Sequence, residues 1–186
     1  MKYRRGELAR VLKSLEEEGV SAVVIGDTSV QLALGQDDLE GDLDLFILNP
    51  SPVAEKEFFN QLADKYNWET STTELGTPSL IVPTSEGHLV IELYENYMDI
   101  DIPMEILEDT VEYRIDGSRV KAIKPEYYIV LKARQGVNLD KLKKHVTQLK
   151  QKGLNIKLVE YALSLYPEDE KEFIEDRLRS IGLELS

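Results

Sequence analysis

The chain has 186 residues, of which 42% are hydrophobic and 31% charged, and this suits one medium domain or a domain with an extension. Its net charge of −13 argues against a sequence-independent nucleic-acid coat protein, because such proteins are basic. No stretch approaches the ~20 apolar residues of a membrane span, and the absence of cysteine leaves no disulfide framework to suggest secretion. We expect a cytoplasmic protein without a membrane segment.

The N-terminal part alternates helix and strand patterns. Apolar residues at helical spacing predict a helix over residues 8–15. The β-branched run at 20–25 predicts a buried strand, and the glycine-containing turn at 26–29 leads into a short helix that ends at Gly35. After a polar loop, residues 42–48 form the second predicted strand. These elements favour a mixed α and β domain.

The remaining elements follow in chain order. Ser51 and Pro52 resemble the N-cap and first residue of a helix that carries Phe58 and Phe59. Extended segments are predicted at residues 79–82, 88–94, 98–102, 111–115 and 119–123, the last two flanking an Asp-Gly hairpin turn. Helices are then predicted from Pro125 and over residues 138–150, 156–165 and 170–181. The sequence thus predicts an α+β core over residues 1–134 and a helical extension over 135–186.

Two aspartates interrupt the apolar strand at 42–48. Side chains of a strand alternate between two faces, so the Asp42 and Asp44 carboxylates share one face, and Leu43, Leu45 and Ile47 point the other way into the core. Two such charges repel unless a proton or a hard cation such as Mg²⁺ lies between them. Paired carboxylates that hold metal ions recur in phosphoryl and nucleotidyl transfer. The alternative is an edge strand whose polar face is simply hydrated.

The turn at 26–29 adds a second chemical feature. Backbone N–H groups at the start of a helix, together with the Thr28 and Ser29 hydroxyls, are suited to receive phosphate. The order strand, glycine turn, helix, loop and Asp-X-Asp strand therefore predicts a site that binds both phosphate and metal. No zinc-site spacing and no Walker A loop competes with this interpretation.

These residues resemble the nucleotidyltransferase (DNA polymerase β-like) superfamily, and above all its minimal members of the toxin or abortive-infection type. Their pattern "GGTA…L…G…DIDLF" is similar to "IGDTSVQLALGQDDLEGDLDLFI" in this chain, and their later "PEDLI..K…R…KD..D" is similar to "IKPEYYIVLKARQGVNLDKLKKH". The likeness covers roughly residues 20–145 in the same order. It implies an α+β nucleotidyltransferase fold, with a mixed sheet core over residues 1–134 flanked by helices and a helical part over residues 135–186.

The resemblance also implies the site. It places the triphosphate of an NTP against Gly26, Thr28, Ser29 and Lys132, with Arg134 or Asp140 near the site. It assigns Mg²⁺ or Mn²⁺ to Asp42 and Asp44. A third carboxylate that binds metal and acts as a general base is expected on the neighbouring strand. Glu92 is the first candidate because it lies in an apolar run, and Asp101 and Asp99 follow it.

The implied reaction is Mg²⁺-dependent transfer of a nucleoside monophosphate from an NTP to an acceptor hydroxyl. The acceptor stays open among RNA such as tRNA, a protein and a small molecule, and a homo-oligomer or a partner protein is compatible with the sequence. Two positions depart from the family pattern, because Asp27 replaces a glycine or serine and Gly41 replaces a serine or threonine. The alternative is therefore a catalytically degenerate nucleotide- or partner-binding module, antitoxin-like or regulatory, on the same fold.

Overall fold

The computed structural model describes all 186 residues and divides into two compact units. The first comprises Met1–Asp101 and Thr110–Ala122, and the second comprises Ile102–Asp109 and Ile123–Ser186. None of the helices combines the length and the apolar composition that crossing a membrane requires.

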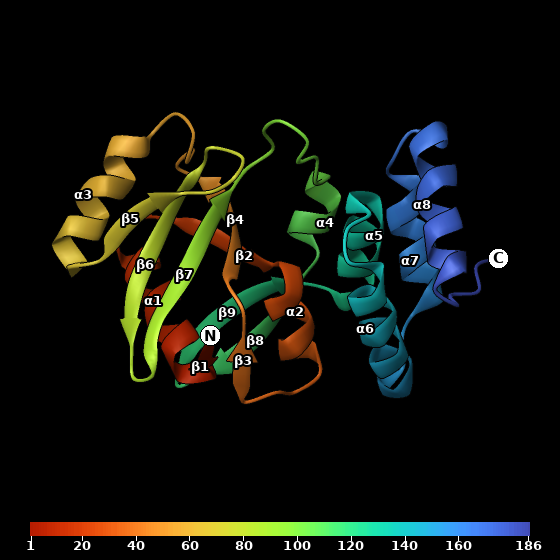
Figure 1. The fold of residues 1–186 in the computed structure, drawn as a ribbon, viewed down its shortest axis with the longest axis horizontal. Coiled ribbons are helices and arrows are strands. Elements are labelled where there is room, and N and C mark those ends of the chain that lie inside the picture. Colours follow the sequence, from red (N-terminus) through yellow and green to blue (C-terminus); the bar gives the residue numbers. More distant parts are fainter. The chain divides into compact units, whose positions relative to one another are not determined.

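A mixed sheet of seven strands, in the order β5-β6-β7-β4-β2-β9-β8, forms the centre of the first unit (Figure 1). Its strands are β2 (Ser21–Ile25), β4 (Leu43–Asn49), β5 (Glu69–Thr72), β6 (Pro78–Thr84), β7 (Gly87–Tyr94), β8 (Thr110–Ile115) and β9 (Ser118–Ile123). The central strand β4 runs antiparallel to β2 and parallel to β7. A separate pair of short strands joins β1 (Lys2–Arg4) to β3 (Asp38–Glu40).

Three helices belong to the first unit: α1 (Arg5–Glu17), α2 (Gly26–Ala33) and α3 (Lys56–Tyr66). One face of β4 carries Leu43, Leu45 and Ile47, which are buried in one cluster with Leu8 of α1 and Phe59 of α3. Burial of each such side chain contributes about 1.5–3 kcal/mol to folding. This face therefore fixes the orientation of β4, and the opposite face carries Asp44.

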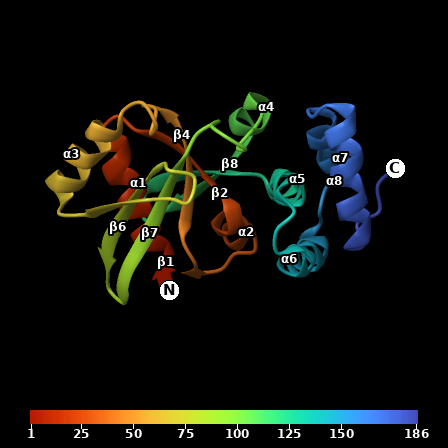
Figure 2. The same cartoon turned by 45° about the horizontal axis from the view of Figure 1, so that its top comes forward.

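Five helices make up the second unit: α4 (Met104–Glu108), α5 (Pro125–Gln135), α6 (Leu139–Lys152), α7 (Ile156–Ser164) and α8 (Glu168–Ser180) (Figure 2). Helix α5 packs against α6, α7 and α8. Its buried Tyr128 hydroxyl lies 2.9 Å from Nδ1 of His145 on α6. Asp109, which follows α4, accepts hydrogen bonds from the Lys124 amine at 2.7 Å and from the Tyr127 hydroxyl.

The mixed α+β fold expected from the sequence is confirmed, and the hairpin at Asp116-Gly117 is present, with both residues at positive φ. The predicted helix start at Pro52 is wrong, because α3 begins at Lys56. Ser51 instead closes a turn, since its Oγ accepts from the Ala54 N–H at 3.0 Å and donates to Glu95 at 2.6 Å. The expected extended segment at 98–102 is also wrong, since no strand forms there.

The division into units differs from the predicted boundary after residue 134. Helix α5, which the sequence prediction placed in the core, belongs to the second unit. The physical reason is that α5 is buried on most of its surface: Ile129, Val130 and Ala133 join its tyrosines in the interior and pack with the helices that follow. Its weak amphipathic character in the sequence reflects that burial on several sides.

Candidate active site

The pairing of strands brings two carboxyl groups together on one face of the sheet. Asp44 of β4 lies in register with Ile25 of β2 on one side and with Glu92 of β7 on the other. Because β4 and β7 run parallel, residues in register project from the same face. The Asp44 and Glu92 side chains share a hydrogen bond. Glu92, the sequence's first candidate for the third carboxylate, is therefore a direct neighbour of Asp44.

Burial of Asp44 raises the pKa of its carboxyl group to about 8, and the negative charges of Glu92, Asp27 and Asp42 add to that effect. Asp42 is exposed and directly precedes β4, and desolvation followed by the charge of Glu92 raises the pKa of its carboxyl. The charges of Glu92, Asp27 and Asp42 thus act on Asp44, and the charge of Glu92 also acts on Asp42. Such a group needs a shared proton or a cation to offset the repulsion.

The glycine turn lies directly against this group. Gly26 begins α2 with φ of +68°, and a Cβ atom on Gly26 would come 2.4 Å from Oδ2 of Asp44. A side chain there would displace the carboxylate, so glycine is required both by the backbone conformation and by the close approach. The turn therefore places the start of a helix, where N–H groups lack intrahelical partners, next to Asp44.

The two hydroxyl residues predicted to contact phosphate face the interior. Thr28 and Ser29 are fully buried. The Thr28 hydroxyl lies 2.8 Å from the Tyr3 hydroxyl, and Ser29 Oγ donates to the Gly26 carbonyl at 2.6 Å. Both hydroxyls thus stabilise the turn from within, and the backbone of the turn is the part best suited to phosphate.

Two tyrosines lie next to the four acidic side chains Asp27, Asp42, Asp44 and Glu92. The Tyr94 hydroxyl donates a hydrogen bond to Oε2 of Glu92. Tyr3 is buried, which raises the pKa of its phenol to about 12, and the charges of Asp44 and Asp42 add to this. Tyr94 could have been found in the sequence because it follows Glu92 by two residues on a strand. Tyr3 gave no signal, because β1 has only three residues, two of them charged.

A sequence model described as "Nucleotidyl transferase of unknown function (DUF2204)" matches residues 4–180. The chain belongs to this family. No curated protein matches the sequence. Among solved structures, an antigenic nucleotidyltransferase-like protein from Paracoccidioides brasiliensis aligns with a TM-score of 0.61 and 17% identity over 97% of this chain and 89% of that one. The lincosamide antibiotic adenylyltransferase LnuA, with lincomycin bound, aligns with a TM-score of 0.55 and 14% identity over 81% and 98%.

These likenesses confirm the nucleotidyltransferase fold that the sequence motifs implied. The family match covers both units, and it includes the glycine turn and the Asp-X-Asp strand. In this member of the family, the sequence signature corresponds to a physical arrangement: Gly26 lies against Asp44, and Asp44 lies against Glu92.

The other predicted site residues lie elsewhere in the chain. Lys132 belongs to α5 in the second unit, where its amine donates to Gln135 at 3.3 Å. Arg134 pairs with Glu170 at 2.7 Å, and Asp140 occupies the first turn of α6. Their roles toward a nucleotide stay predictions. Asp99 and Asp101 follow β7, and neither is among the charges that raise the pKa of Asp42 or Asp44.

The acidic group has the right chemistry for a divalent cation, because Mg²⁺ and Mn²⁺ prefer carboxylate oxygens. Burial and mutual repulsion of Asp44 and Glu92 are the features that a cation would relieve. The structure shows no group of three or more acidic or histidine side chains already arranged around a metal position. The carboxylates of Asp44 and Glu92 are therefore suited to bind a cation together. The exposed Asp42 lies close enough to Glu92 to take part.

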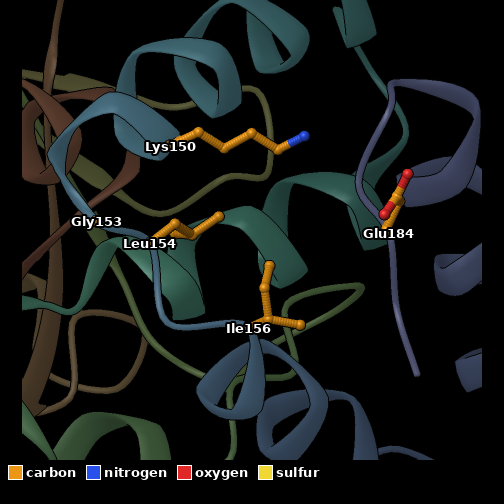
Figure 3. A pocket seen from close by; sticks show the side chains of 5 residues that line it. All are labelled: Lys150, Gly153, Leu154, Ile156 and Glu184. Carbon is orange, nitrogen blue, oxygen red and sulfur yellow. The ribbon is translucent and has the colours of Figure 1, made fainter.

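A separate hollow of about 320 Å³ lies in the second unit and is lined by Lys150, Gly153, Leu154, Ile156 and Glu184 (Figure 3). Most of these residues are exposed. The Lys150 amine donates to the Gly182 carbonyl at 2.6 Å. Because its one cationic group already holds the C-terminal segment, the hollow lacks the convergent polar groups of a ligand site.

Proposed function

We propose that the protein transfers a nucleoside monophosphate from an NTP to an acceptor hydroxyl and releases pyrophosphate. One observation carries the proposal: Asp44 and Glu92 share a hydrogen bond on neighbouring parallel strands, directly beside the glycine turn that opens α2. A Mg²⁺ or Mn²⁺ ion held by Asp42, Asp44 and Glu92 would lower the charge on the phosphates. Membership of a nucleotidyl transferase family supports the same reaction class.

The chain's own groups have distinct tasks in this proposal. The start of α2 receives phosphate oxygens, since its N–H groups carry partial positive charge. The acceptor oxygen attacks the α-phosphorus, and the bond from that phosphorus to the bridging oxygen of the β-phosphate breaks. The acceptor's proton passes to a carboxylate, which we assign to Glu92 because it is the acid on the strand next to Asp44.

The acceptor is a hydroxyl of a small molecule, a protein or RNA. The net charge of −13 makes a large polyanionic acceptor the least favourable of these, because association with nucleic acid is driven mainly by cationic contacts to phosphate. An RNA acceptor would therefore need a local basic surface and would bind with strong dependence on salt.

A second candidate function is a nucleotide- or partner-binding module without catalysis. Asp27 favours it, because its negative charge lies close enough to Asp44 to raise the pKa of that carboxyl. A carboxylate in the first turn of α2 competes with phosphate for the helix start. In this alternative, Asp27→Gly tightens NTP binding but yields no transfer, whereas the enzyme proposal requires transfer by the parent protein.

The test is incubation of the protein with each α-labelled NTP, Mg²⁺ or Mn²⁺, and separate pools of RNA, protein and small molecules. We expect label to enter one pool and pyrophosphate to accumulate, with transfer reduced at least about 100-fold in Asp44→Asn and in Glu92→Gln. Asp38→Asn, which removes one exposed carboxylate on β3, is the matched control and should keep full activity.

Two results would contradict the proposal. The first is an absence of label from all three pools with every NTP and both metal ions. The second is transfer that survives unchanged in Asp44→Asn and in Glu92→Gln, which would place the reaction elsewhere in the protein.

A further inference from the structure

Tyr94 is held beside the carboxyl pair by the alternation of the strand. It follows Glu92 by two residues on β7, so the two side chains project from the same face of the sheet. Its hydroxyl donates a hydrogen bond to Oε2 of Glu92, and Glu92 shares a further hydrogen bond with Asp44. The hydrogen-bonded series Tyr94–Glu92–Asp44 therefore runs from β7 to β4.

The contact restricts how Glu92 can point. A glutamate side chain has several freely rotating bonds, and ordering it costs conformational entropy. The Tyr94 ring is only partly exposed and lies opposite Phe46 of β4, which is 4% exposed, so the phenol itself is held by packing. One oxygen of Glu92 is thus fixed by a rigid donor.

The Tyr94 phenol is well suited to donate a hydrogen bond to a carboxylate. Its hydroxyl is uncharged and donates to Oε2 of Glu92 in this contact. A neutral donor orients a carboxylate without neutralising its charge, whereas a lysine in the same place would offset the charge that attracts a cation.

We infer that Tyr94 is a positioning residue, which holds the Glu92 carboxylate in the orientation used for nucleotidyl transfer. The inference rests on the proposed function, because it takes Glu92 to be part of the site. It is not a packing role alone: Tyr94→Phe keeps the ring opposite Phe46 and removes only the hydroxyl. Partners that orient metal-binding groups change affinity or activity by about 10–100-fold when they are removed.

The experiment compares Tyr94→Phe with the parent in two measurements. In steady-state transfer with the metal ion saturating for both proteins, we expect kcat to fall about 10–100-fold while KM for the NTP stays within about twofold, because Tyr94 acts on Glu92 and not on the triphosphate. In Mn²⁺ titrations followed by the electron paramagnetic resonance of the free ion, we expect affinity to fall by a similar factor. In a Glu92→Gln background, Tyr94→Phe should add little to either loss.

Tyr66→Phe is the matched control. It also removes a tyrosine hydroxyl that donates to a glutamate at 3.0 Å in the same unit, from Tyr66 at the end of α3 to Glu18, which directly follows α1. Its kcat and Mn²⁺ affinity should equal those of the parent.

The outcomes separate this inference from the proposed function. If the parent transfers nucleotide and Tyr94→Phe matches it in both kcat and Mn²⁺ affinity, the inference is wrong and the proposed function stands. If the parent binds Mn²⁺ but transfers nothing, and Tyr94→Phe weakens Mn²⁺ binding, the proposed function is wrong and the positioning of Glu92 stands. A parent that binds no Mn²⁺, or losses that are additive with Glu92→Gln, would overturn the inference.

Discussion

Asp44 combines two properties that rarely occur together, burial of its carboxyl group in the central strand β4 and a negatively charged neighbourhood. Its pKa of about 8 follows first from burial and then from Glu92, Asp27 and Asp42. A structural role does not explain this arrangement, because replacing either acid with an apolar residue would remove the repulsion. Strongly shifted carboxyl groups of this kind mark functional sites more often than they mark packing.

The shift predicts how the metal-free protein responds to pH. The pKa of Asp44 is about 8 in the folded state and near the ordinary value of about 4 when unfolded, so the folded state binds the proton more tightly. The stabilising contribution is complete below about pH 4 and is lost as pH rises toward 8. Asp44→Asn lacks this loss, so it should gain stability relative to the parent as pH rises from 5 to 8, by at most about 1.4 kcal/mol per unit.

Urea denaturation of both proteins at several pH values measures this difference, and Asp38→Asn serves as the exposed control whose difference from the parent should stay flat. A stability difference between Asp44→Asn and the parent that does not change with pH would show that the carboxyl is not held as the structure describes.

Among the elements, the junction between β2 and α2 is the one that brings the start of a helix next to Asp44. Strand β2 is paired with β4 through Ile25 and Asp44, and Gly26 then starts the helix against the same carboxylate. A substitution at Gly26 therefore acts on the helix start and on Asp44 together. We predict that Gly26→Ala destabilises the protein by about 2–4 kcal/mol, from the positive φ and from the overlap with Oδ2.

Gly41→Ala separates the two causes. Gly41 also has a positive φ, of +89°, but nothing lies within 4 Å of the position a Cβ would take. Gly41→Ala should therefore lower the free energy of unfolding only by the amount due to backbone conformation, about 1–2 kcal/mol. Equal losses of stability in the two variants, measured by thermal or urea unfolding, would contradict the close approach of Gly26 to Asp44.

Some helices and strands of this fold can be predicted from the sequence, and others cannot. Strands β2, β4 and β7 were predictable because β-branched and apolar residues dominate them, and α5 to α8 because caps and glycines bound them. The strands β1, β3 and β5 were not, since they are short and mainly polar, and their pairing depends on neighbours far along the chain. The start of α3 was misplaced because Ser51 and Pro52 form a turn that Glu95, 44 residues away from Ser51, completes.

Within the site, the chemistry was more predictable than the contacts. The alternation of strand residues placed Asp42 and Asp44 on one face, and the apolar run around Glu92 indicated an acid without a structural reason. No sequence pattern indicates that Asp44 and Glu92 lie in register, because register follows from the pairing of strand residues that are 48 positions apart in the chain. For the same reason, the burial of the Thr28 and Ser29 hydroxyls was visible only in the fold.

At the scale of the whole molecule, a chain with a net charge of −13 is proposed to bind a polyanionic nucleotide. Repulsion between the negatively charged surface and the nucleotide opposes such binding. A divalent cation at Asp42, Asp44 and Glu92 would neutralise the local negative charge and so allow the nucleotide to bind. Nucleotide binding should therefore depend on the metal ion much more strongly than in a protein whose site is lined by lysines and arginines.

The most direct test of this account is calorimetric titration of the protein with a non-hydrolysable NTP, with and without Mg²⁺. The parent should bind the nucleotide only when Mg²⁺ is present, and the folded Asp42→Asn, Asp44→Asn double variant should bind at least about tenfold more weakly under the same conditions. The parent binding equally well without Mg²⁺, or the double variant binding as tightly as the parent with it, would contradict the account.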